Sequence, residues 1–294
     1  MNLNFSGAVL SQAVASGIML GGLFALMSIG LTLIWGVMKI INFAQGEFLM
    51  VALYLAYFLV ARGHIDPYIT IIITVPFMFF FGIGIFRATI SPILKDPVMN
   101  QIMLTLGVSL ILQNLALMLF SANVQSVNTR YSTWNIHLGS VVISGTQLIA
   151  LVGSVLCTLG VWYFLKTTDS GRAIRASAQN PTAATLMGID VPRTYLLAFG
   201  LGSATLGLAG SLMIPFYYTS PTVGLFLGLI MFIVVVLGGM GNLMGCFVGG
   251  LVIGLAETVG SAVLPGSLAR VFTFVIFIVF LLFRPQGILS RRQT

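Results

Sequence analysis

Charged side chains are scarce in this sequence and absent from most of its length. They make up 6% of its 294 residues, against about a quarter in an ordinary soluble domain. Five long stretches contain none, namely 1–38, 67–86, 97–129, 131–165 and 194–256. A helix that crosses a bilayer needs about 20 mostly apolar residues. Because the apolar runs are continuous rather than alternating, the sequence predicts an all-α, polytopic membrane protein rather than a barrel.

Cysteine and histidine are also rare, with two of each. Cys157 and Cys246 lie in apolar stretches, and His64 and His137 lie in separate connections, so we expect no disulfide framework and no metal site. The sequence lacks a phosphate-binding loop, a zinc-protease motif and a nucleophile elbow. We therefore expect no cofactor, no catalytic residue and no enzymatic activity. The net charge of +7 is typical of cytoplasmic loops, so it predicts a lipid membrane and no nucleic acid as partner.

The apolar segments predict eight or nine helices in one transmembrane domain that covers residues 1–294. No basic residue precedes the first segment, unlike a cleaved signal peptide, so we expect a permanent span there. The expected segments are Gly7–Gly36, Phe43–Ala61, Pro67–Arg87, Val98–Phe120, Val141–Leu165, Thr194–Met213, Gly224–Leu237, Gly245–Ser261 and Ala269–Phe283.

The connection 166–193 differs from the others because it gathers six charged residues, four of them basic. The positive-inside bias places it in the cytoplasm, together with the arginines of the C-terminal region. Asp169 or Ser170 is expected to cap one short helix, and Pro181 to begin another. The connection either fixes topology alone or forms a coupling loop that docks on another protein. Candidate contact residues are Gly171, Arg172, Arg175, Ala176, Asn180 and Pro181.

Two breaks interrupt the apolar segments, near residues 36–46 and 238–245. Broken helices in corresponding positions of two halves often mark a transport path. Asn42 and Gln45 have the spacing of a capping box, with Lys39 as a candidate partner of Glu47. These residues either only begin a helix or also shape a gate, and the glycines either touch cargo or allow close packing. The path candidates are Asn42, Gln45, Glu47, Gly238, Gly239 and Gly241.

The placement of the charges also constrains the topology of the second half. An even number of crossings must separate the cytoplasmic connection 166–193 from a cytoplasmic C-terminus. The stretch 224–261 is too long for one helix at about 1.5 Å rise per residue. Breaking it at the glycines restores an even number of crossings. The uncharged connection 214–223 then lies outside, and the break lies near the cytoplasmic side or the midplane.

Four stretches occur in the order typical of one family. They are 30–48, which contains Asn-Phe-Ala-Gln-Gly-Glu, then 171–176, then 236–241 with Leu-Gly-Gly-Met-Gly, and finally 284–289 with Arg-Pro-Gln-Gly. The chain resembles the smaller permease subunit of the branched-chain amino acid ATP-binding-cassette importers, over essentially its whole length. One departure is Gln45, where many members carry histidine.

The resemblance implies a complex in a bacterial inner membrane. A second permease subunit, giving a heterodimer, would complete the path. Two cytoplasmic ATPase subunits would bind the loop 166–193, and a periplasmic substrate-binding protein would deliver the cargo. A urea or short-amide permease remains an alternative. From another class, a self-sufficient channel or an ion-coupled carrier would need carboxylates at membrane depth, for which Glu47 is the clear candidate and Glu257 a marginal one.

Overall fold

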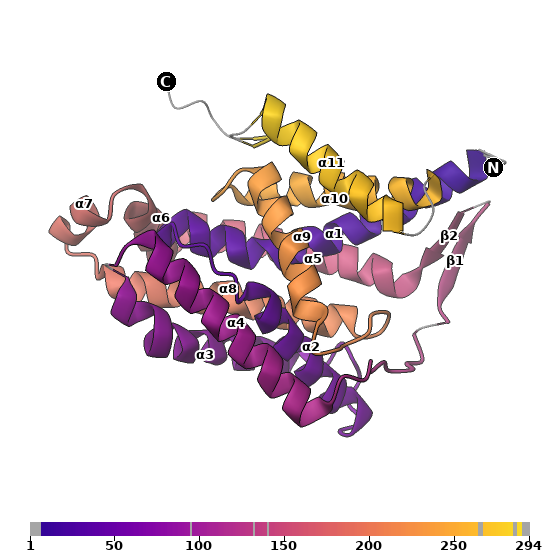
Figure 1. Ribbon diagram of the computed structural model, residues 1–294, viewed down its shortest axis with the longest axis horizontal. Coiled ribbons are helices and arrows are strands. Elements are labelled where there is room, and N and C mark those ends of the chain that lie inside the picture. The colour runs from indigo at the N-terminus through magenta and orange to yellow at the C-terminus, as the bar shows by residue number, and fades with distance from the viewer. Residues whose placement is uncertain are drawn as a thin grey trace.

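The computed structural model describes residues 7–94, 96–131, 133–139, 141–263, 267–284 and 287–289 (Figure 1). The described chain is mainly helical, with one short two-stranded sheet, which confirms the expected all-α membrane bundle. Its helices are α1 (Gly7–Met38), α2 (Gln45–Ala61), α3 (Ile71–Ile85), α4 (Val98–Phe120), α5 (Gly145–Thr167), α6 (Asp169–Gln179), α7 (Pro181–Leu186), α8 (Val191–Met213), α9 (Val223–Gly238), α10 (Leu243–Val263) and α11 (Ser267–Phe283).

The long helix α1 forms the centre of the molecule. All residues from 21 to 34 are buried, as expected for a helix that is apolar on every side. Its main partner is the antiparallel helix α10, followed by α8 and α5. Close approach depends on glycine: a Cβ added at Gly21 would lie 2.7 Å from Leu251 Cα, and one at Gly250 would lie 2.5 Å from Ala25 N. This is the small-residue packing of membrane helices.

Six of the described helices are long and apolar enough to cross a membrane, one of them α3 with the helical turns that follow it to Ile93. The helices α3, α4 and α5 leave most of their apolar side chains on the outside of the bundle. Such exposure suits contact with lipid or with another subunit rather than with water. The helices α2 and α9, which adjoin the two breaks, have 17 and 16 residues.

Both expected breaks are present, and the second one lies at the end of the bundle that carries α6 and α7. The α9–α10 turn packs on the last turn of α1, where a Cβ added at Gly36 would lie 3.0 Å from Gly241 Cα. The chain after α11 returns to the same turn, since Ile288 N donates to Leu237 O at 2.9 Å. Because α6 also contacts α1, this arrangement agrees with an even number of crossings between the connection 166–193 and the C-terminal region.

The opposite end of the bundle carries the connections 62–70, 121–131 and 214–222 (Figure 1). Gln125 and Thr219 exchange two backbone hydrogen bonds of 2.8 Å, and the Tyr131 hydroxyl donates to Asp66 at 2.6 Å. Burial is the main cause that raises the pKa of Tyr68 to about 12, with Tyr131 and Asp66 adding to the shift. This phenol therefore stays protonated at neutral pH.

The expected start of a helix at Val141 is wrong. Val141–Ser144 is strand β2, paired antiparallel with β1 (Asn135–Leu138), and α5 begins only at Gly145. β-branched residues such as Val141, Val142 and Ile143 favour a strand wherever a partner is within reach. Gln12 of α1 holds this hairpin, since its amide donates to Val142 O at 2.8 Å and accepts from Val142 N at 2.7 Å.

Cysteine labelling tests this topology. We expect Tyr218→Cys and Thr182→Cys, each in a Cys157→Ala, Cys246→Ala background, to react with an impermeant thiol reagent from opposite sides of the membrane. Both positions are exposed, whereas the neighbouring Thr219 is fully buried. Sealed vesicles of either orientation provide the measurement. Labelling of both cysteines from one side would refute the arrangement.

Candidate functional site

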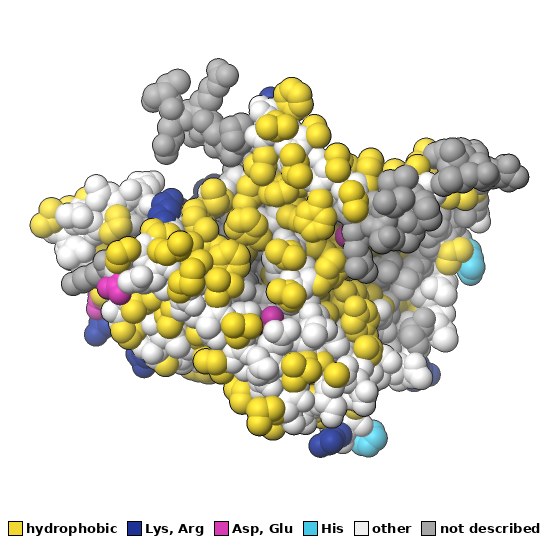
Figure 2. Space-filling model, viewed as in Figure 1, with side chains coloured by type: hydrophobic (Ala, Val, Ile, Leu, Met, Phe, Trp, Pro, Cys, Tyr) yellow, Lys and Arg dark blue, Asp and Glu magenta, His cyan; other side chains and the backbone are white. Residues whose placement is uncertain are grey.

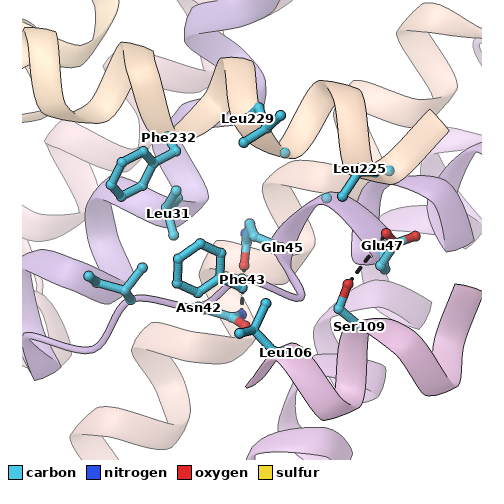
Figure 3. A pocket seen from close by; sticks show the side chains of 14 residues that line it. Leu31, Asn42, Phe43, Gln45, Glu47, Leu106, Ser109, Leu225, Leu229 and Phe232 are labelled. Atoms are coloured by element: carbon cyan, nitrogen blue, oxygen red, sulfur yellow. Dashed lines mark hydrogen bonds between the residues drawn. The ribbon is translucent and has the colours of Figure 1, made fainter. Parts of the chain in front are cut away.

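The connection between α1 and α2 builds one wall of a cleft. The chain leaves α1 at Lys39, which has a positive φ of 59°, and it re-enters helix at Gln45. The Asn42 side chain accepts from Ala44 N at 3.1 Å and donates to the Gln45 side-chain oxygen at 3.0 Å (Figure 3). Ala44 is the N-cap and has no side-chain cap. The expected capping box is therefore wrong, because Asn42 bonds to the turn before the helix and to the Gln45 amide.

Glu47 follows in the first turn of α2 and lies almost completely buried, with 1% of its surface exposed. One carboxylate oxygen lies 3.5 Å from Ser109 Oγ of α4, and the other has no hydrogen-bond partner (Figure 3). Lys39 is exposed and does not pair with it, since the ion pairs of the described residues are Asp169–Arg172 and Asp190–Arg193. The acid sits where the helix dipole favours negative charge.

The cleft itself lies between the start of α2, the middle of α4 and the first half of α9. A Cβ added at Gly46 would lie 2.9 Å from Gly228 Cα, so α2 and α9 meet backbone to backbone. The cleft offers about 70 Å³ to water-sized molecules, which is room for several waters. Its side walls are apolar, and Figure 3 shows them around the polar residues: Phe43, Leu106, Leu225, Leu229 and Phe232.

Two buried polar atoms at the cleft are not paired in the structure, Gln45 Nε2 and Glu47 Oε2. An unsatisfied buried polar group costs about 1–3 kcal/mol, and more when it is charged. The rim is exposed and apolar, with Leu225 61% and Leu229 47% exposed. Figure 2 shows hydrophobic side chains over much of the face that carries α4, α9 and α11. A polar floor beneath an apolar rim is a surface suited to a second protein and to polar cargo.

The three glycine candidates lie elsewhere, in the α9–α10 turn. Gly239 and Gly241 have positive φ values of 97° and 87°, which glycine adopts without strain. Gly238 packs on the backbone of Gly245 and Cys246, where an added Cβ would lie 2.5 Å from atoms of both. The structure thus brings Asn42, Gln45 and Glu47 into one cleft and places these glycines outside it, in close packing.

The loop 166–193 contains the two expected short helices, α6 and α7. Thr168, not Asp169 or Ser170, is the N-cap of α6 and accepts from Gly171 N at 3.0 Å. Asn180 caps α7 by accepting from Ala183 N at 3.0 Å, and Pro181 is its first residue, as expected.

The candidate contact residues of α6 fall on two sides of the helix. Gly171 is buried against the end of α5, where an added Cβ would lie 2.6 Å from Leu165 Cα. Ala176 is half-buried, whereas Arg172 and Arg175 are exposed. Arg172 pairs with Asp169 and donates to Thr167 O at 3.2 Å, and Arg175 donates to Leu165 O. The exposed charged side chains of α6 are therefore two arginines and Asp169.

The sequence reasoning missed two residues at the tip of this loop. Leu186 and Met187 are each 83% exposed, at the point where α7 ends before Gly188, whose φ is 82°. Large apolar side chains this exposed on a polar loop mark an interaction surface. The signal was present in the sequence as an adjacent apolar pair next to a glycine within the charged connection.

Residues 13–281 match the family described as the branched-chain amino acid transport system permease component. The chain belongs to this family. It is therefore a multi-pass permease of the inner membrane, and it functions as one component of a transport system.

Several relatives within this family match along nearly the whole chain. The high-affinity branched-chain amino acid transport system permease protein LivH of Salmonella typhimurium is 31% identical, with 96% of each chain covered. The corresponding BraD protein of Pseudomonas aeruginosa is 30% identical with the same coverage. The fructose import permease protein FrcC of Rhizobium meliloti is 31% identical over 41% of this chain and 34% of its own. No solved structure gives a significant match.

Proposed function

We propose that this chain is a translocating subunit of an ATP-binding-cassette importer for branched-chain amino acids. The observation that carries the proposal is the match of residues 13–281 to the permease family, together with full-length relatives whose names specify this substrate class. Its partners would be a second, different permease subunit, two cytoplasmic ATPase subunits and a periplasmic substrate-binding protein. The chain itself would perform no chemical step.

The loop of α6 and α7 would receive the ATPase subunits. Two features support this role: the exposed arginines of α6 and the exposed apolar pair Leu186 and Met187 at the tip. Interfaces commonly combine apolar anchors with arginine at a polar rim. Because α6 is packed against the ends of α5, α1 and α8, a force on the loop would reach the core helices directly.

The cleft at Asn42, Gln45 and Glu47 would form half of the path. Its volume of about 70 Å³ for water-sized molecules holds only a few waters, so one chain provides a wall and a second permease would provide the opposite wall. An ion-coupled carrier is less well supported, because Glu47 and Glu257 are the acidic residues within the described apolar helices. The urea or short-amide alternative differs in cargo, not in architecture.

Charge reversal at Arg172 tests the docking role of the loop. We expect Arg172→Glu to leave membrane insertion unchanged, because the side chain is exposed. ATP-driven leucine uptake and substrate-stimulated ATP hydrolysis should fall about tenfold or more, since a reversed charge at an interface commonly costs several kcal/mol. Proteoliposomes that contain the assembled transporter provide both measurements.

The matched control is Arg87→Glu, an exposed arginine that follows α3 outside the loop. It should retain uptake close to that of the unmodified chain. Normal uptake by Arg172→Glu at normal protein levels would contradict the docking role. Failure of the unmodified complex to import any branched-chain amino acid would contradict the proposed function itself.

A further inference from the structure

The ends of α2 and α4 that point away from α6 and α7 (Figure 1) contribute residues to a second hollow. It is separate from the cleft at Glu47 and shares none of its residues. It offers about 230 Å³ to water-sized molecules, more than three times the room in the first cleft. Its lining includes Tyr54, Tyr57, Phe58, Arg62, Phe120 and Gln125.

Hydrogen-bond donors without acceptors gather around this hollow. Tyr54 is 3% exposed, and its buried hydroxyl has no hydrogen-bond partner. Gln125 accepts from the Tyr57 hydroxyl at 2.9 Å through its side-chain oxygen, which orients the amide nitrogen away from that bond. Within the described residues that nitrogen makes no hydrogen bond. Leaving a buried phenol unpaired is unfavourable, so its partner is expected to come from outside the chain.

A positive charge lies at the same place. The Arg62 guanidinium sits 5.0 Å from the centre of the Phe58 ring, and it forms no ion pair in the part of the chain that the structure describes. The lining contains no carboxylate. Asp66, which follows Arg62 in the same connection, is already engaged, accepting from the Tyr131 hydroxyl at 2.6 Å and from Tyr68 N at 2.9 Å. A cationic, donor-rich and acceptor-poor hollow is complementary to an oxyanion.

The lining of the hollow also contains aromatic rings. The Tyr54 and Phe120 rings stack with their centres 4.4 Å apart, and Phe58 lies 5.0 Å from Phe120. Arg62 lies over the Phe58 ring, so the apolar surface left for a ligand is the part of Phe58 and Phe120 that lines the hollow. The complementary ligand has a small oxyanionic head joined to an apolar body.

We propose that this hollow is an outer binding site for the oxyanion of a small amphiphilic molecule, held by Arg62, Tyr54 and Gln125 with its apolar part on Phe58 and Phe120. Two sources share this chemistry. One is the carboxylate of an amino acid on its way to the cleft, a source that rests on the proposed function. The other is the phosphate of an anionic lipid of the outer leaflet, which is independent of it.

Arg62 also has a simpler role as a cation at the C-terminal end of α2, where the helix dipole favours positive charge. That role explains neither the unpaired phenol nor the free amide. Lysine at position 62 would preserve the charge at the helix end but would lose the two-pronged geometry that suits an oxyanion. Arg62→Lys therefore separates the two roles.

Protection of a cysteine measures the occupancy of the hollow. Ser121 lines it and is exposed, so Ser121→Cys, in the background Cys157→Ala and Cys246→Ala, reports access to a thiol reagent in the assembled transporter. Leucine is compared with leucinol, which keeps the amine and side chain but lacks the carboxylate. Bilayers of phosphatidylcholine are compared with bilayers that contain phosphatidylglycerol.

We expect leucine, at about four times its dissociation constant for the hollow, to slow the labelling of Ser121→Cys about fivefold. Leucinol should leave the labelling rate unchanged. Lipid occupancy would instead give slow labelling in phosphatidylglycerol and no response to leucine. Tyr54→Phe combined with Arg62→Lys should remove whichever protection is found. Labelling that responds to neither leucine nor lipid, or protection that survives both substitutions, overturns the site. Uptake by the unmodified complex, measured alongside, shows whether the proposed function stands independently.

Discussion

Replacing Leu186 and Met187 together by serine should abolish ATP-driven uptake while the chain still inserts and folds. Both side chains are 83% exposed at the end of α7, so their loss removes little packing within this chain. If both side chains become buried in a groove of the ATPase, each contributes about 1.5–3 kcal/mol to the free energy of association. Losing both would weaken the association by about 3–6 kcal/mol, which is more than a hundredfold in affinity.

Co-purification of the ATPase subunits with the tagged permease measures this association, and substrate-stimulated ATP hydrolysis measures the coupling. Met240 and Met244, which are 47% and 36% exposed near the α9–α10 turn, provide a matched control outside the loop. Their double replacement by serine should retain the association. Unchanged co-purification and hydrolysis in the Leu186→Ser, Met187→Ser variant would show that the tip does not contact the ATPase.

The membrane helices and both breaks were predictable because they depend on local composition. A long uncharged run must become helix in hydrocarbon, and clustered glycines interrupt it. Local reasoning failed where neighbouring residues offered equivalent choices. Thr168, Asp169 and Ser170 all have side chains that can cap a helix, and the extended backbone of Thr168, with φ −85° and ψ 154°, decides between them.

The cleft was only half predictable. Asn42, Gln45 and Glu47 lie close in sequence, and they do meet. Ser109 and Gly224 join them only because α2 packs between α4 and α9, and a single sequence contains no record of that packing. The hairpin 135–144 was missed for the same reason, since a short run such as Val141–Ile143 reads as helix or strand until its partner is known.

Packing also decides which glycines can contact cargo. Gly238, Gly239 and Gly241 share a sequence signature that fits either a path or a close helix contact, and their contacts are with Gly36, Gly245 and Gly287. Gly224 and Gly228 lie outside both breaks, yet they line the cleft together with Gly46. A glycine marks a close approach in either case, and only the fold identifies what approaches.

The substitution Glu47→Gln should lower the maximal rate of uptake about tenfold or more, with little change in half-saturation. Glutamine keeps the shape and the hydrogen bond to Ser109, so the complex should still assemble. It replaces a buried acid, whose second oxygen is unpaired in the single chain, by a group that cannot ionise. Hydrogen bonds to charged groups contribute about 1.5–3 kcal/mol, and a loss of that size in the translocation barrier corresponds to about tenfold to a hundredfold in rate.

Half-saturation should change little because affinity in such a system would reside mainly in the binding protein. Ser109→Ala is the matched variant: it removes the 3.5 Å contact but leaves the charge, so its maximal rate should fall much less. If Glu47 only begins α2, the loss of its charge would cost about 0.3–1 kcal/mol of helix stability. Transport by assembled Glu47→Gln complexes would then equal that of the unmodified chain. Equal maximal rates in proteoliposomes with matched protein content would therefore assign Glu47 to helix initiation alone, and a selective fall would place its carboxylate on the path.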